Sequence, residues 1–262
     1  MTEWTCDDAR MELRVGIVSG ARNAAENLGK LCDDLALAVG CEVSPRVFAT
    51  QAELRDAVDK RELEVAWASP IAAVRLELSG VASIALGIHR EGGSSYSSAI
   101  FTTASSPIRE LEQLRGKRIA WVDSDSAAGY VIPLQKLRAA GVTSFAAQLF
   151  EGSHHAVVRA VLGGRADAGA TNLAIDPQTG AHESAGWTNV APSAAIRILA
   201  TAGPIPPDVI VIARAVPEAM QDKVTESLLA MAMREHVLAL FGGRGFVLVG
   251  RYQYEALRKL LV

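Results

Sequence analysis

One junction recurs four times along the sequence: a short apolar strand, then a serine with a small or helix-starting neighbour, then an amphipathic helix. The four junctions are Ser19-Gly20, Ser69-Pro70, Ser126-Ala127 and Ser153-His154. Serine is a preferred N-cap residue, and proline at the first helical position strengthens a helix start. Strands that alternate with helices in this way predict an α/β fold with mostly parallel sheets. In such sheets, ligands bind at the carboxyl ends of the strands, where helix N-termini gather.

Length, charge and hydropathy exclude several classes of protein. The 262 residues, 50% of them hydrophobic, can bury a sizeable core as one α/β domain or as two lobes. A net charge of −3, with acids and bases mixed along the chain, gives no basic stripe for nucleic acid. The apolar stretch 228–241 is broken by three polar residues, so no membrane span is predicted. Residues 1–8 lack a secretory signal, so we expect a cytoplasmic protein, or a periplasmic one if a leader has been removed.

The stretch 116–130 carries the strongest indication of a binding site. A short apolar strand runs into the small residues Ser126, Ala127, Ala128 and Gly129, and Pro133 then opens a helix. Unpaired backbone N–H groups and the helix dipole attract anions at a helix N-terminus, and small side chains let a phosphate-sized group come close.

The four junctions are divided by the extended segment 96–103, with two before it and two after it. We therefore expect two lobes whose helix N-termini face each other and grip one small anion from both sides. The alternative is that each serine only caps its own helix.

Patterns for catalysis and metal binding are absent from the sequence. It contains no H-E-x-x-H, G-x-S-x-G or G-x-x-x-x-G-K-[ST] motif. Its three cysteines lack the spacing of a zinc site. We predict no metal, no cofactor and no catalytic residue.

Four segments carry a family resemblance: residues 64–70 read EVAWASP, residues 122–130 read VDSDSAAGY, residues 152–154 read GSH, and residues 205–208 read IPPD. They are similar to a strand ending in Ser-Pro, a Val-Asp…Ser-Thr-Ser-Gly-Tyr signature, a Gly-Ser-His segment and an Ile-Pro-Asn-Asp crossing. These motifs are found together in the substrate-binding components of phosphate, phosphite and phosphonate ABC importers. The resemblance runs from about Leu13 to Tyr254.

The resemblance implies a two-lobed fold like that of type II periplasmic-binding proteins, each lobe a mixed, mostly parallel sheet flanked by helices. Residues 11–98 and 205–262 would form lobe 1 and residues 99–204 lobe 2, with the ligand cleft between them. It also implies a substrate-binding protein, or a cytosolic sensor derived from one, that closes over a small phosphate- or phosphonate-like anion without chemistry. An ABC permease would be a partner if the protein is exported.

Ten ligand-binding residues follow from the resemblance. They are Ser69, Tyr96, Ser126, Ala127, Ala128, Gly129, Tyr130, Ser153, His154 and Asp208. The Ser126 hydroxyl and the amides of the next three residues would bind the anion oxygens, with Ser69 capping the anion from the other lobe. Tyr96 would offer its phenol and His154 a ring N–H. Asp208 would bind a ligand hydroxyl, an ammonium group or a protonated oxygen. The alternatives are structural roles for Tyr96 and Asp208, and helix capping for His154.

Departures from the family pattern leave two other functions open. Ser126-Ala127-Ala128 replaces the usual Ser-Thr-Ser, which removes two hydroxyl donors worth about 1.5–3 kcal/mol each. Gln51-Ala52 replaces a common aromatic residue, and Thr171-Asn172 stand where acidic or aromatic residues often line the cleft. The chain is then either a cytosolic enzyme of the same fold acting on a small carboxylated metabolite, with Asp208 or His154 as general base, or a regulatory domain with a vestigial ligand site.

Overall fold

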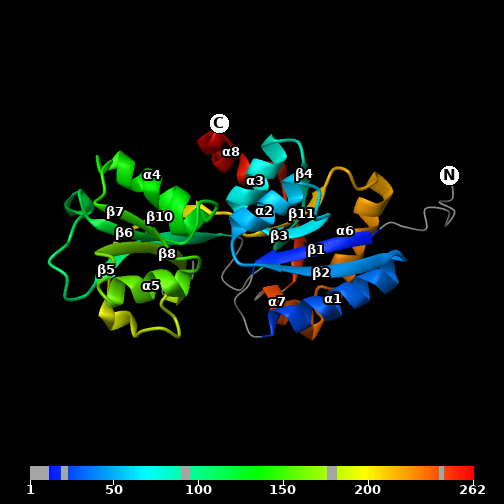
Figure 1. Ribbon diagram of the computed structural model, residues 1–262, viewed down its shortest axis with the longest axis horizontal. Helices are drawn as coiled ribbons and strands as arrows, with labels where there is room; N and C mark the ends of the chain where they lie inside the picture. Colours follow the sequence, from blue (N-terminus) through cyan, green and yellow to red (C-terminus); the bar gives the residue numbers. More distant parts are fainter. Residues whose placement is uncertain (1–11, 19–22, 90–94, 176–181, 242–244) are drawn as a thin grey trace.

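The computed structural model describes residues 12–18, 23–89, 95–175, 182–241 and 245–262. Its strands form two separate sheets, which lie side by side along the long axis of the molecule (Figure 1). We use lobe 1 for the first sheet with its helices and lobe 2 for the second. The junction Ser19-Gly20 lies outside the described residues.

The sheet of lobe 1 has the strand order β12-β4-β11-β3-β1-β2. Its strands are β1 (Glu12–Val18), β2 (Glu42–Phe48), β3 (Val65–Ala68), β4 (Ala82–Ile88), β11 (Val209–Ala213) and β12 (Phe246–Leu248). β1 runs parallel to β2 and β3, whereas β11 runs antiparallel to β3 and β4. The sheet is therefore mixed. Its last two strands, β11 and β12, follow the strands of lobe 2 in the sequence.

Helices cover both faces of this sheet (Figure 1). One face carries α1 (Ala24–Val39), α6 (Glu218–Met231) and α7 (Glu235–Phe241), and the other carries α2 (Gln51–Asp59), α3 (Pro70–Leu78) and α8 (Glu255–Leu261). The helical spacing of Leu28, Leu31 and Leu35 places all three on the face of α1 that is buried against the sheet. α1 ends at Gly40, whose φ of 79° is in the left-handed region that glycine adopts readily.

The sheet of lobe 2 has the order β10-β5-β8-β6-β7, and β9 pairs with β8. Its strands are β5 (Tyr96–Thr103), β6 (Arg118–Trp121), β7 (Ala147–Phe150), β8 (Ala168–Ile175), β9 (His182–Ala185) and β10 (Ile196–Ile205). α4 (Ile132–Ala139) packs on one face and α5 (His154–Leu162) on the other. Short turns of helix complete the chain: η1 (Leu111–Leu114), η2 (Ala127–Val131), η3 (Ser193–Ala195) and η4 (Arg251–Tyr254).

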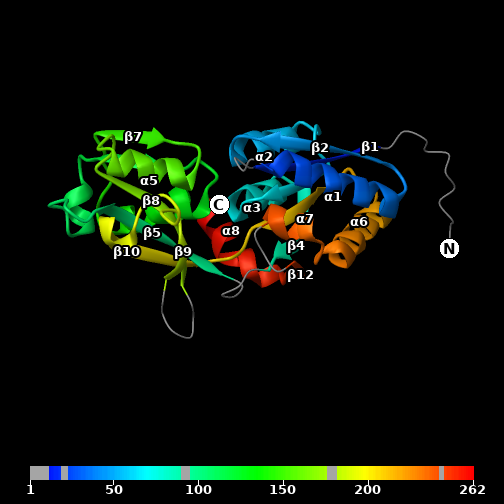
Figure 2. The same ribbon diagram turned by 90° about the horizontal axis from the view of Figure 1, so that it is seen from below.

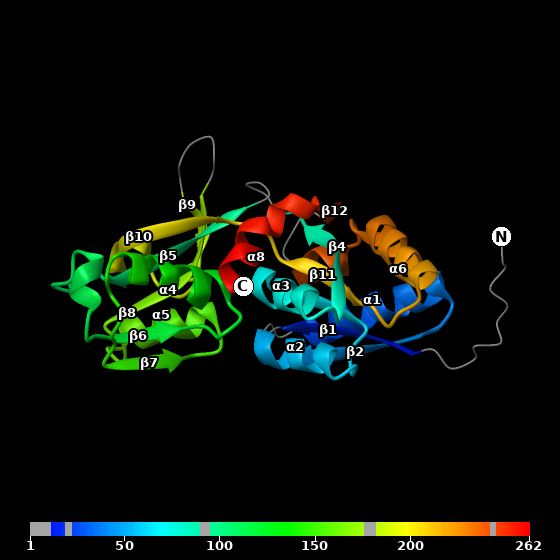
Figure 3. The ribbon, with the colours of Figure 1, turned by 90° about the horizontal axis from the view of Figure 1, so that it is seen from above.

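Two mixed sheets flanked by helices confirm the predicted α/β fold class. The prediction that each sheet is mostly parallel is wrong, because antiparallel strand pairs outnumber parallel pairs in both sheets among the described residues. The chain passes from one sheet to the other between β4 and β5 and again between β10 and β11. The lobe boundaries at 98/99 and 204/205 stay a prediction. Figure 2 and Figure 3 show α3 and α8 at the end of lobe 1 that faces lobe 2. An apolar cluster there joins Ile71 and Tyr254 of lobe 1 to Ala127 and Ala128 of lobe 2.

Candidate functional site

The helix start at Ser69 contacts lobe 2 directly. β3 ends at Ala68, and α3 begins at Pro70 with Ser69 as its N-cap. The Ser69 Oγ accepts the backbone N–H of Ala72 at 3.2 Å and donates its own hydrogen to the carbonyl of Asp125 at 2.6 Å. The helix start of lobe 1 therefore meets the residue that precedes Ser126.

The turn after β6 begins at Ser126, whose Oγ accepts the backbone N–H of Gly129 at 3.0 Å. The Ser126 carbonyl accepts from both Tyr130 and Val131, which produces a π-helical turn ahead of α4. Gly129 is required by close packing, because a Cβ there would lie 2.3 Å from Cγ2 of Val122. Its amide is committed to Ser126.

The backbone N–H groups of Ala127 and Ala128 differ from that of Gly129, which donates to Ser126. These two residues are only 2% and 1% exposed. In the part of the chain that the structure describes, no hydrogen bond starts from either N–H. Buried backbone N–H groups are almost always paired. Two adjacent unpaired donors at a helix N-terminus form a site that favours an anion.

Two buried carboxylates flank this turn, and sequence reasoning missed both. Asp125 is 0% exposed and pairs with Arg55 of α2 and Arg75 of α3. Burial raises the pKa of Asp125, and the two guanidinium groups oppose that rise. Asp123 accepts the backbone N–H of Asp125 at 2.8 Å. Burial also raises the pKa of Asp123 against hydrogen bonds from the backbone of Asp125, Gln51 and Ser126.

The sequence Asp123-Ser124-Asp125 could have indicated that these carboxylates pair with cations. Two acidic residues in a turn expected to bind an anion demand nearby cations. The structure supplies them from the other lobe, as the guanidinium groups of Arg55 and Arg75.

A second group of predicted residues lies in lobe 2. Ser153 is exposed and caps α5, accepting the Ala156 N–H at 3.2 Å. His154 Nδ1 lies 2.9 Å from Oγ1 of Thr171 and accepts the backbone N–H of Asn172 at 3.3 Å. Gly186 lets these groups approach, because a Cβ there would lie 1.8 Å from the Thr171 Oγ1. His154 is thus held against the Thr171-Asn172 positions that the sequence assigned to the cleft.

The remaining predicted residues are Tyr96 at the start of β5, Asp208 just before β11, and Tyr130 in η2. Tyr96 is half-buried at the first position of β5, opposite Ile205. Asp208 accepts the Ile88 N–H at its carbonyl, 2.9 Å away. Burial is the main cause that raises the pKa of Tyr254, and the Asp208 charge adds to it.

Tyr130 belongs to an aromatic group at the end of the Ser126 turn. Its ring centroid lies 5.5 Å from that of Trp121 and 5.2 Å from that of Phe150. The structure thus brings Ser69 to the Ser126 turn and groups His154 with Thr171 and Asn172. It places Tyr96 at the start of β5 and Asp208 between β10 and β11.

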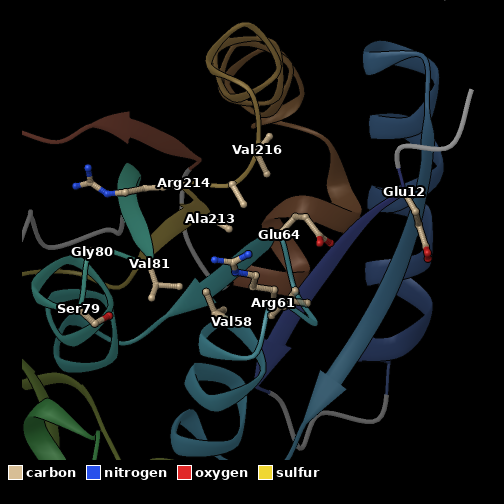
Figure 4. Close-up of a pocket in the computed structure, with 12 residues that line it drawn as sticks. Glu12, Val58, Arg61, Glu64, Ser79, Gly80, Val81, Ala213, Arg214 and Val216 are labelled. Carbon is tan, nitrogen blue, oxygen red and sulfur yellow. The ribbon is translucent and has the colours of Figure 1, made fainter. Parts of the chain in front are cut away.

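A cavity of about 590 Å³ opens at the other edge of the lobe 1 sheet (Figure 4). Its lining includes Glu12 at the start of β1, Arg61 after α2, and Arg214 after β11. Ser69 follows the opposite end of β3, so this cavity is separate from the predicted site. Within the described ranges, no three His, Cys, Asp or Glu side chains cluster as metal ligands. No described helix combines the length and the apolar character needed to span a bilayer.

Comparisons with known proteins agree on the fold. The solved structures that resemble the chain include PhnD1 from Prochlorococcus marinus in complex with methylphosphonate (17% identity, TM-score 0.74, 95% of this chain and 96% of that chain). They also include the binding protein component of an ABC phosphonate transporter from Pseudomonas aeruginosa (18% identity, TM-score 0.77, 95% and 85%). A third is XAC2383 from Xanthomonas citri bound to ATP (20% identity, TM-score 0.76, 95% of each chain).

The search of curated proteins gives no match. The family model described as "ABC transporter, phosphonate, periplasmic substrate-binding protein" matches residues 18–254. The chain therefore belongs to the family of periplasmic substrate-binding proteins of phosphonate ABC transporters.

Proposed function

We propose that the protein lies outside the cytoplasmic membrane and binds a small phosphonate- or phosphate-like anion at the Ser126 turn, without chemistry. It would deliver this anion to an ABC permease. The observation that carries the proposal is the pair of buried, unpaired N–H groups of Ala127 and Ala128 at a helix start that faces lobe 1. Family membership and the methylphosphonate complex of a similar fold support the class of ligand.

The hydrogen bonds of the turn divide the donors into two sets. The amides of Ala127 and Ala128 would bind anion oxygens together with the hydroxyl hydrogen of Ser126, whose oxygen already caps the helix. The amide of Gly129 and the hydroxyl of Ser69 have partners within the protein. They would reach the ligand only if those bonds open. The two alanine amides are thus retained as donors, although the Ser-Ala-Ala sequence lacks two hydroxyl groups.

Other residues would contact the rest of the ligand. Because the Asn172 N–H donates to His154 Nδ1, a neutral His154 ring would carry its hydrogen on Nε2 and offer it to the anion. Asp208 would accept a hydrogen from a ligand hydroxyl, an ammonium group or a protonated oxygen. Tyr96, Tyr130 and Ser153 complete the proposed set of contacts.

The geometry bears on the two alternative functions. In an enzyme, Asp208 would be the better candidate for the general base, because the His154 Nδ1 that would take a proton already contacts Thr171 and Asn172. In a vestigial site, two buried N–H groups would remain unpaired, at a cost of about 1–3 kcal/mol each.

Isothermal titration with methylphosphonate and with inorganic phosphate tests the proposal. At a hundredfold excess over the dissociation constant, a ligand should stabilise the fold by about 2.7 kcal/mol, so thermal unfolding provides a second readout. An Ala127→Pro variant removes one amide donor at the first helical position, where proline is well tolerated. Ala127→Val is its control, because it adds side-chain carbons at the same buried position and keeps the N–H.

We expect Ala127→Pro to bind the anion at least tenfold more weakly than Ala127→Val, since a charge-assisted hydrogen bond is worth about 1.5–3 kcal/mol. Equal affinities in the two variants would overturn the role of the turn. If the wild type binds neither anion and Ala127→Thr with Ala128→Ser does, the site is vestigial. Turnover of a carboxylated metabolite that Asp208→Asn abolishes would favour an enzyme.

A further inference from the structure

Asp125 is the only buried carboxylate among the described residues whose ion pairs both come from the other lobe. Arg55 Nη1 lies 2.8 Å from its Oδ2 and 3.0 Å from its Oδ1. Arg75 Nη1 pairs with Oδ1. The two arginines lie on different helices, α2 and α3, so one carboxylate of lobe 2 connects two elements of lobe 1.

The backbone of Asp125 adds a third connection. Its carbonyl accepts the Ser69 hydroxyl at 2.6 Å, and the Ser69 N–H donates to Oε1 of Gln51, the first residue of α2, at 2.8 Å. The starts of α2 and α3 are thereby tied to each other and to Asp125. The residue after Asp125 is Ser126, which begins the proposed anion-binding turn.

Burial makes this arrangement sensitive to the loss of either charge. A buried ion that loses its partner is strongly unfavourable, because neither water nor another charge compensates it. Arg55 has other carboxylates nearby, with Asp56 at 2.9 Å and Asp59 at 3.8 Å. Besides the two arginines, Asp125 has two acidic groups nearby, Asp123 and Asp56. The charge of Asp125 therefore depends on lobe 1 staying in this position.

Resting on the proposed function, we propose that Asp125 is a positioning residue for ligand binding. By holding Arg55 and Arg75, its carboxylate fixes the Ser126 turn against the Ser69 helix start, so that one anion meets both lobes. It acts on the ligand through the relative placement of the lobes, without touching it.

The test combines small-angle scattering, which reports the separation of the lobes, with titration of methylphosphonate and inorganic phosphate. The variants are Asp125→Asn, Arg75→Gln and Arg75→Lys, where lysine keeps the charge of Arg75. Asp167→Asn is the matched control. Asp167 pairs with Arg118 at 2.7 Å within lobe 2.

We expect Asp125→Asn and Arg75→Gln to increase the radius of gyration and to weaken anion binding at least tenfold, with Arg75→Lys recovering part of both losses. Asp167→Asn should resemble the wild type in both measurements. If Asp125→Asn fails to fold, Arg75→Gln decides, since Arg75 is the more exposed partner.

Three results would overturn the positioning role: variants that match Asp167→Asn in both readouts, weaker binding with unchanged scattering, or altered scattering with unchanged binding. A wild type that binds neither anion would refute the proposed function instead. In that case the radius of gyration alone decides whether Asp125 sets the placement of the lobes.

Discussion

The small residues of the Ser126 turn are explained by packing as much as by ligand binding. Ala127 and Ala128 are buried in the apolar cluster beside Ile71 and Tyr254, where a larger or more polar side chain would need new partners. Ser98 donates to the Ala128 carbonyl at 2.7 Å, which holds the turn on β5. The sequence Ser-Ala-Ala therefore suits a turn that offers backbone groups and few side chains.

Gly129 allows a sharp test of this packing. Adding a Cβ would place it 2.3 Å from Cγ2 and 2.6 Å from Cβ of Val122, which has little freedom at the end of β6. We expect Gly129→Ala to lower the free energy of unfolding by about 1–3 kcal/mol, as overpacking does. Urea unfolding measures the loss.

Gly29→Ala is the matched control for Gly129→Ala. No atom lies within 4 Å of a Cβ at Gly29, which is in the interior of α1. The same substitution should there raise the free energy of unfolding by about 0.5–1 kcal/mol. A stable Gly129→Ala variant would show that the turn can move away from Val122.

Helix starts were the elements that sequence reasoning predicted best. The predicted serine caps Ser69, Ser126 and Ser153 are confirmed, because each side chain accepts the backbone N–H three residues later. Such caps depend on neighbours in the chain, so a local pattern can report them. The π-helical turn at 127–131 was not predicted, because it depends on the packing of Gly129 against Val122.

A comparison of Ser69 with Thr50 distinguishes the stability that comes from helix capping from the stability that comes from a contact between the lobes. Both side chains cap a helix of lobe 1, and Ser69 also donates a hydrogen bond to a lobe 2 carbonyl, that of Asp125. Thr50→Ala should cost about 1 kcal/mol of unfolding free energy. Ser69→Ala should cost about 2–4 kcal/mol, because it also leaves the buried Asp125 carbonyl without its partner. Equal losses in chemical denaturation would mean that the bond between the lobes adds nothing to stability.

For the whole molecule, the sequence predicted the fold class and two lobes with helix-covered sheets. It could not predict the ion pairs through which the lobes contact each other. Arg55 and Arg75 lie 70 and 50 residues before Asp125, and no periodicity connects positions so far apart. The predicted meeting of Ser69 with the Ser126 turn required the family resemblance as well as the repeated junctions. The ion pairs behind that meeting depend on tertiary packing alone.

The buried carboxylate between the lobes should leave a mark on the pH dependence of stability. A carboxyl group whose pKa is higher in the folded protein than in the unfolded chain binds more protons when folded, so its contribution to stability is lost as pH rises. Asp125 belongs to this class, because burial raises its pKa. Asp167 belongs to the opposite class, because the hydrogen bond from Arg118 lowers its pKa, and its contribution is lost as pH falls.

Urea unfolding of the wild type, Asp125→Asn and Asp167→Asn across a pH series measures both effects. The stability difference between the wild type and Asp125→Asn should shrink as pH rises upward from the unfolded-state value of about 3.9. For Asp167→Asn the same difference should grow as pH rises up to that value. Opposite slopes follow because Asp125 is enclosed between two lobes, whereas Asp167 pairs at the surface of one. A rising difference for both variants would mean that the arginines of lobe 1 outweigh the burial of Asp125.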